Sequence, residues 1–90
     1  MLVKFEVRVP HLARKSLNKI SLPWRERINL ALNGLETNPF AGEKMWGKLT
    51  GKYKIKIWPY RIIYKVNEKT TVVGIVNIGH RGDSGAIGYK

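Results

Sequence analysis

The sequence predicts an α+β fold in which an antiparallel sheet is covered on one face by a helical pair, in the order β-α-α-β-β-β. Three observations support this class. Residues 2–9 alternate apolar and charged side chains, residues 11–35 place apolar side chains at helical spacing, and residues 52–78 contain three further strand patterns. Helices and strands that are segregated along the chain in this way are typical of a two-layer α+β sandwich.

The first strand and the first helix are predicted from two different periodicities. Pro10 ends the strand and suits the first turn of a helix over residues 11–20. The alternation in the strand places four apolar side chains on its inner face, which are Val3, Phe5, Val7 and Val9.

A second helix is expected after Ser21, which is a suitable N-cap residue, and Pro23, which fits the first helical turn. Asn38-Pro39 is expected to stop this helix. Its inner stripe contains Trp24, Ile28, Ala31, Leu32 and Leu35.

The second half of the chain is predicted to be a loop followed by three strands. Residues 40–51 form the loop, with a short strand expected near residues 46–49. The strands span residues 52–58, 61–67 and 70–78. The last of them is apolar on both faces, as is typical of a strand inside a sheet, and a glycine-rich segment follows it.

The strand over residues 52–58 carries the most unusual pattern in the chain. Lys52, Lys54 and Lys56 alternate with Tyr53, Ile55 and Ile57, so the lysines share one face of the strand. The apolar residues are expected to face the helices and the lysines the open side of the sheet. Arg61 begins the next strand across a tight turn, and Arg81 follows the last strand, so both are expected near Lys54 and Lys56.

Composition points to an anionic partner. The chain of 90 residues has 17 Lys and Arg against six Asp and Glu, a net charge of +11. An excess of this size favours nucleic acid, an anionic surface or an acidic protein. No cysteine is present, which excludes disulfides and cysteine-ligated zinc. No linker or repeat divides the chain, so residues 1–90 are expected to form one domain with 43% apolar residues for its core.

Several classes of site are excluded by their missing motifs. The sequence contains no glycine-rich phosphate loop, no paired histidines at metal spacing and no serine or cysteine nucleophile signature. It shows no secretory signal or membrane-spanning run, so a cytoplasmic protein without membrane contact is expected. What remains is a face rich in Lys and Arg, with Trp58, Tyr60 and Tyr89 near it.

Two interpretations of this face are open from the residues alone. Alternating lysines are often the hydrated face of a strand or its protection against aggregation. Alternatively, cations bind phosphates and aromatic rings stack on unpaired bases. Lys and Arg also stabilise the charge of a phosphoryl transition state without a metal, and a lysine among other cations can accept a proton.

The chain resembles the RelE/ParE toxin superfamily, and its RelE branch in particular. Residues 49–66, LTGKYKIKIWPYRIIYKV, resemble the central strands of that family. Residues 72–81, VVGIVNIGHR, resemble its final strand and the basic residues that follow. The order of helices and strands derived above is also the order of the family.

The resemblance implies a toxin of a type II toxin-antitoxin system that cleaves mRNA in the ribosomal A site. This endoribonuclease needs no metal or other cofactor, because the 2′-hydroxyl attacks the adjacent phosphate. By resemblance, Lys54 accepts the proton or holds the 2′-oxygen, Lys56 and Arg61 stabilise the phosphate, and Arg81 acts at the leaving group. Lys52, Lys65 and His80 are candidate RNA-binding residues.

The match is looser at the tyrosine of the family. That tyrosine falls where this chain has Ile87, and Tyr89 lies two residues further on. Tyr89 is therefore the candidate catalytic tyrosine, with His80 as the alternative acid-base residue. The family also implies an acidic, RelB-like antitoxin that assembles with a monomeric toxin into a hetero-oligomer. Other readings are a ParE-type inhibitor of DNA gyrase and an RNA-binding member of the fold with weak catalysis.

Overall fold

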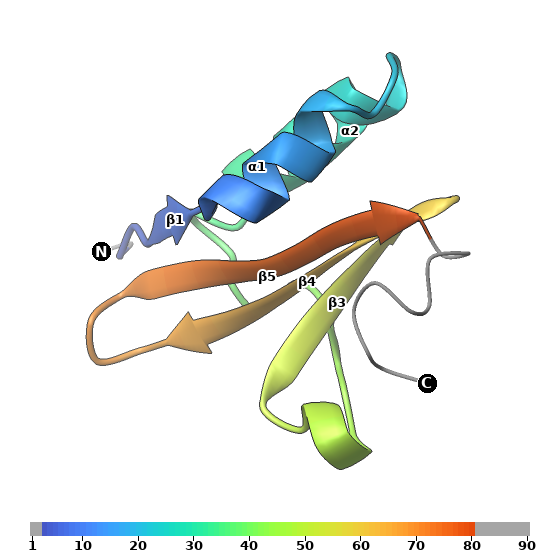
Figure 1. The fold of residues 1–90 in the computed structure, drawn as a ribbon. Helices are drawn as coiled ribbons and strands as arrows, with labels where there is room; N and C mark the ends of the chain where they lie inside the picture. Colours follow the sequence, from blue (N-terminus) through green and yellow to red (C-terminus); the bar gives the residue numbers. More distant parts are fainter. Residues whose placement is uncertain (1–2, 81–90) are drawn as a thin grey trace.

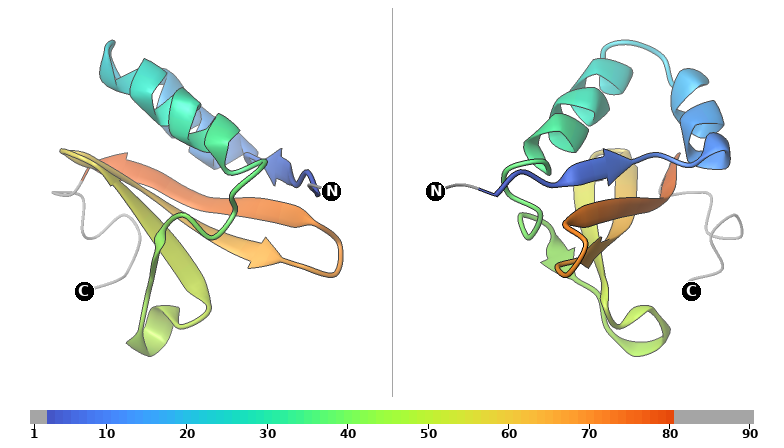
Figure 2. Two further views of the ribbon diagram at one scale, coloured as in Figure 1. Left: turned by 180° about the vertical axis from the view of Figure 1, so that it is seen from behind. Right: turned by 90° about the vertical axis from the view of Figure 1, so that its left-hand side faces the viewer.

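The computed structural model describes residues 3–80, which form a layer of two helices over one face of a twisted sheet (Figure 1). The helical layer consists of α1 (His11–Asn18) and α2 (Trp24–Gly34). The strands are β1 (Glu6–Arg8), β2 (Glu43–Lys44), β3 (Lys52–Ile57), β4 (Tyr60–Asn67) and β5 (Val72–His80). The two further views show both helices on the same side of the sheet (Figure 2). The predicted α+β class is therefore confirmed.

The sheet is mixed, which corrects the prediction that it is antiparallel. Its order is β1-β5-β4-β3-β2, and β1 pairs with β5 in parallel while the other neighbours are antiparallel. The alternation in β1 predicts which side chains face the helices. It does not predict whether β1 runs parallel or antiparallel to its neighbour, because the same side chains face the helices in both directions. The direction is set by the chain path, because the helices connect β1 to the rest of the sheet as a crossover does.

The helices bury the stripes that their spacing predicts. Ile28 and Leu35 are 0% and 1% exposed, and Trp24 and Ala31 pack on the same core. The start of α2 differs from the prediction: Pro23 holds the N-cap position, and no side chain caps this end. Ser21 contributes its carbonyl instead, which accepts a hydrogen bond from the backbone N–H of Arg25 at 3.1 Å.

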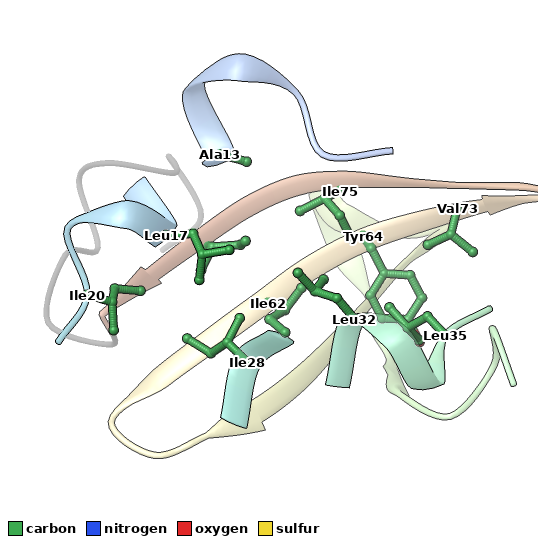
Figure 3. Close-up of a cluster of buried hydrophobic side chains, with 11 residues drawn as sticks. Ala13, Leu17, Ile20, Ile28, Leu32, Leu35, Ile62, Tyr64, Val73 and Ile75 are labelled. Carbon is green, nitrogen blue, oxygen red and sulfur yellow. The ribbon is translucent and has the colours of Figure 1, made fainter. Parts of the chain in front are cut away.

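The core lies between the helices and the central strands β4 and β5, as Figure 3 shows. Val76 is an extra residue in β5, because Ile63 pairs with Asn77 and the next residue, Tyr64, pairs with Ile75. This β-bulge reverses the alternation of β5. Ile75 and Ile78 are therefore both buried against the helices, at 2% and 1% exposure, while Val76 is exposed.

The loop before β3 differs from the prediction of a short strand at residues 46–49. Those residues contain a 3₁₀ turn, Gly47–Leu49, and the short strand β2 lies earlier in the chain. Gly47 has a φ of 70° and Gly51 a φ of 95°, a region that favours glycine and breaks a strand. Within residues 3–80, neither helix has the length and apolar character needed to cross a membrane.

Candidate functional site

The open face of the sheet, on the side away from the helices, carries the lysines of β3. The pairing of β3 with β4 sets Lys56 opposite Arg61 and Lys52 opposite Lys65, and residues directly opposite each other share a face. Lys54 lies between these rows, opposite Ile63. The apolar residues of β3 pack on the helix-side core, so the two faces of this strand are confirmed, with Tyr53, Ile55 and Ile57 inside.

The row formed by Lys56 and Arg61 lies beside the end of β5. Arg61 is half-buried and pairs with Gly79, which has no side chain to cover it on this face. Lys56 is exposed. Two cations on neighbouring strands are separated by about 5 Å between backbones, a distance at which both can contact one phosphate group. The structure therefore brings together three of the predicted catalytic residues, Lys54, Lys56 and Arg61.

A carboxylate that sequence reasoning missed lies within this group of cations. Glu43 on β2 pairs with Lys54, and its Oε1 is 3.8 Å from Nζ of Lys56. Both side chains are largely exposed, so this ion pair contributes little stability and leaves the lysine accessible to an anion. No sequence signal marks Glu43, because the pairing of a two-residue strand is decided by the fold.

Gly42 and Tyr64 hold β2 against β3. The backbone N–H of Gly42 donates a hydrogen bond to the Tyr64 hydroxyl at 2.9 Å, and the Tyr64 ring stacks on Tyr53 with centroids 5.5 Å apart. A Cβ atom at residue 42 would lie 2.7 Å from the carbonyl oxygen of Lys54. Only glycine permits this close approach. Burial raises the pKa of Tyr64, an effect that the hydrogen bond from Gly42 opposes and the nearby Tyr53 reinforces.

His80 does not join the lysine face. It pairs with Tyr60, and the two rings meet edge to face with centroids 5.4 Å apart. Tyr60 packs on the helix-side core and lies 6.4 Å from the Trp24 ring, so His80 is on the helix side of the sheet. Tyr60 is therefore also turned away from the open face.

Trp58 lies in the tight turn between β3 and β4 and is 68% exposed. Its carbonyl accepts a hydrogen bond from the indole N–H of Trp24 at 3.2 Å, which ties the turn to α2. Of the aromatic residues expected near the site, Trp58 is thus the one whose ring is accessible in the described part of the chain. Arg81 and Tyr89 lie outside the described residues. Within residues 3–80 there is no group of three or more His, Asp or Glu side chains that could hold a metal ion.

The sequence profile of a protein family matches residues 7–85, and that family is described as the ParE toxin of the type II toxin-antitoxin system, parDE. The chain belongs to this family. It is a toxin of the RelE/ParE superfamily, and the resemblance stated from residues 49–66 and 72–81 is confirmed at that level. No curated protein sequence shows a significant match to this toxin.

Solved structures share the fold of the toxin. The RelBE2 toxin-antitoxin complex of Mycobacterium tuberculosis contains a chain that is 26% identical to it, with a TM-score of 0.77. The structural alignment covers 88% of this chain and 100% of that one. A double arginine-to-alanine mutant of Escherichia coli RelE in the free state is 22% identical, with a TM-score of 0.77 and coverage of 94% and 92%. The archaeal RelE–RelB complex from Pyrococcus horikoshii OT3 is 24% identical, with a TM-score of 0.73 and coverage of 88% and 97%.

Proposed function

We propose that this toxin is a ribosome-dependent, metal-independent endoribonuclease that cleaves mRNA in the A site. The observation that carries the proposal is the common face of Lys54, Lys56 and Arg61, with two cations paired directly across neighbouring strands. Fold alone does not separate ribonucleases from other toxins of the superfamily, so the argument rests on these side chains.

In the proposed reaction the 2′-oxygen attacks the adjacent phosphorus and the bond to the 5′-oxygen breaks. The products are a 2′,3′-cyclic phosphate and a 5′-hydroxyl. Lys54 accepts the proton of the 2′-hydroxyl or orients its oxygen, while Lys56 and Arg61 bind the phosphate oxygens on which negative charge develops. Arg81 stabilises the charge on the leaving 5′-oxygen or donates a proton to it, and Tyr89 stacks on a neighbouring base. Lys52 and Lys65 bind flanking phosphates.

Primer extension on mRNA held in programmed ribosomes, with naked mRNA in parallel, tests the proposal. Wild-type toxin is expected to cut at the A-site codon only when ribosomes are present. Arg61→Ala is expected to cleave about 100-fold more slowly, because one positioned donor to a transition-state oxyanion contributes a factor of this size.

Lys15→Ala is the matched control, since this exposed lysine lies on α1, in the other layer. It should cleave as fast as the wild type. Equal rates for Arg61→Ala and the wild type would remove Arg61 from the mechanism, and no cleavage by the wild type in either reaction would refute the ribonuclease.

Inhibition of DNA gyrase is the alternative function, and the match to a family named for ParE favours it. A supercoiling assay with purified gyrase distinguishes the two activities. Inhibition of supercoiling by the toxin, together with intact mRNA on ribosomes, would assign the ParE-type activity.

We further propose that the partner of this cytoplasmic toxin is an acidic antitoxin of the RelB type. Solved structures of this fold include the RelE–RelB complex from Pyrococcus horikoshii OT3 and a YoeB–YefM complex from Staphylococcus aureus. A net charge of +11 favours association with an acidic chain. We expect a monomeric toxin to assemble with the antitoxin into a hetero-oligomer in which the antitoxin covers the lysine face or displaces residues 81–90. A complex that contacts neither would contradict this arrangement.

A further inference from the structure

A second group of cations lies on the open face, far from the row of Lys56 and Arg61. The sheet register aligns Lys65 on β4, Gly74 on β5 and Arg8 on β1 in one row across three strands. Beside this row is an open groove of about 750 Å³ next to the β4–β5 hairpin. Its lining includes Arg8, Lys65, Glu68, Lys69, Thr70 and Gly74.

Gly74 lines the groove and has no side chain to fill it. The Cγ and Cε atoms of Lys65 lie 3.8 and 3.9 Å from the place where a Cβ atom on Gly74 would be. The aliphatic part of Lys65 therefore packs beside Gly74, in the space that a side chain on β5 would fill. Arg8, which is opposite Gly74 in the parallel pairing, lies on the far side of the same row.

The charges of this groove are available to an anion. Among the described residues, no ion pair involves Lys65 or Lys69. Arg8 donates from Nε to Glu6 at 2.8 Å, which raises the pKa of Arg8 and lowers that of Glu6. A guanidinium has five N–H donors, so Arg8 keeps donors for a second acceptor. The lining thus holds three cations and the carboxylate of Glu68, and with the Glu6 carboxylate that is bonded to Arg8 the positive charges remain in excess.

The spacing of the two cationic rows suits a nucleic-acid strand. Lys65 is four residues along β4 from Arg61, a distance of about 13 Å on the same face. Stacked nucleotides advance about 3.4 Å each, so a single strand that crosses the sheet places a phosphate at each row within about four nucleotides. Lys54, which pairs with Ile63, lies between the two rows on the same face.

We propose that the groove of Arg8, Lys65 and Lys69 is a second phosphate-binding subsite that holds the backbone of single-stranded RNA a few nucleotides from the phosphate at Lys56 and Arg61. An acidic peptide is the less favoured occupant, because the groove continues the line of cations along one open face. The assignment of that strand as mRNA rests on the proposed ribonuclease function, whereas the binding of single-stranded RNA is tested by itself.

The experiment measures fluorescence anisotropy of labelled 2′-O-methyl oligoribonucleotides, which cannot be cleaved by 2′-oxygen attack. The test variant is the double substitution Lys65→Gln and Lys69→Gln. The matched control is Lys15→Gln and Lys19→Gln, which removes the same charge from exposed positions in and next to α1. We expect the test variant to bind about tenfold more weakly and its salt slope to fall by about 1.4, roughly 0.7 for each lost phosphate contact. The control should bind within about twofold of the wild type, since it loses only distant charge.

A length series separates a subsite from general attraction. Wild-type affinity is expected to rise when the oligonucleotide becomes long enough to reach both rows, and the test variant should lose that step. Equal loss of affinity in the test and control variants would overturn the proposal. The proposal would also be overturned if the wild-type protein bound an Asp- and Glu-rich peptide in preference to RNA and the test variant lost only its binding of the peptide. If ribosomal cleavage fails but the test variant still loses RNA binding, the proposed function is refuted and the subsite stands.

Discussion

At the residue scale, the candidate site depends on side chains that are placed by their opposite neighbours. Lys56 lies opposite Arg61 in the pairing of β3 with β4, and it forms an ion pair with Glu43 of β2. Neither residue is adjacent to Lys56 in the sequence. Glu43 partly neutralises a group of like charges that would otherwise repel each other. Behind this group, the buried hydroxyl of Tyr64 accepts the hydrogen bond from Gly42 that holds β2 in place.

The raised pKa of Tyr64 predicts that the folded protein loses stability in alkaline solution. Its pKa in the folded protein is raised above the ordinary value of 10.0, mainly by burial, so the unfolded chain releases this proton first. The contribution to stability is complete below pH 10.0 and is lost as the pH rises from there through the folded pKa. Denaturant unfolding at a series of alkaline pH values measures the slope.

Tyr64→Phe provides the control for this slope. The variant has no hydroxyl to titrate, so its stability should fall less steeply with pH than that of the wild type. It should also be about 1 kcal/mol less stable at neutral pH, because the N–H of Gly42 loses its partner. Identical alkaline slopes in the two proteins would show that Tyr64 does not cause the effect.

At the element scale, β2 is the shortest strand within residues 3–80, and yet it positions Glu43 beside β3. It has two residues and pairs only with β3, at the edge of the sheet. Short strands need support from side chains outside the ladder. The segment before β2 receives it from Phe40, whose ring meets Tyr53 edge to face at 5.6 Å, and from the bond between Gly42 and Tyr64.

Gly42→Ala is expected to damage both the stability of the protein and the proposed cleavage of mRNA. The new methyl group would lie 2.7 Å from the Lys54 carbonyl and from the Tyr64 hydroxyl, so the backbone of β2 or β3 must move. Overpacking of this kind costs roughly 1–3 kcal/mol. Because Lys54 is next to the clash, cleavage on programmed ribosomes should fall even where circular dichroism shows the variant to be folded.

Gly34→Ala is the matched control in α2. Apart from its chain neighbours and the backbone of its own helix, no atom lies within 4 Å of a Cβ at that residue, and its φ is not positive. The substitution should stabilise the protein by about 0.5–1 kcal/mol, since alanine favours a helix over glycine. Thermal unfolding followed by circular dichroism compares the two variants, and a Gly42→Ala protein as stable as Gly34→Ala would contradict the steric argument.

At the scale of the whole molecule, the excess charge acts on partners more than on the fold. The ion pairs Lys4–Glu36, Arg8–Glu6 and Lys56–Glu43 are exposed and contribute little stability. A net charge of +11 instead creates a positive field that attracts polyanions and increases their rate of encounter.

This field predicts a strong effect of salt on the proposed cleavage of mRNA. Between about 50 mM and 200 mM salt, kcat/KM on programmed ribosomes should fall at least about tenfold, because phosphate contacts release counterions. The single-turnover rate at saturating ribosomes should change much less, since binding is then complete. A kcat/KM that does not respond to salt would mean that charge does not drive the association.

The sequence by itself determined the features that are encoded locally. The alternation in residues 52–57 decided that the lysines and the apolar residues lie on opposite faces, because side chains along a strand alternate wherever it pairs. The apolar spacing in residues 24–35 likewise determined the buried stripe of α2. The resemblance in residues 49–66 identified the superfamily and proposed the roles of Lys54, Lys56 and Arg61.

Only the tertiary structure decided which distant segments meet. The parallel pairing of β1 and the position of Glu43 depend on the chain path and on packing, which no local period encodes. His80 is the clearest case. Continued alternation from Ile75 would place it on the open face, but the extra residue Val76 shifts β5 by one position and turns His80 toward Tyr60. Because a side chain in a strand changes face with every residue, one inserted residue is enough to move it to the other side of the sheet.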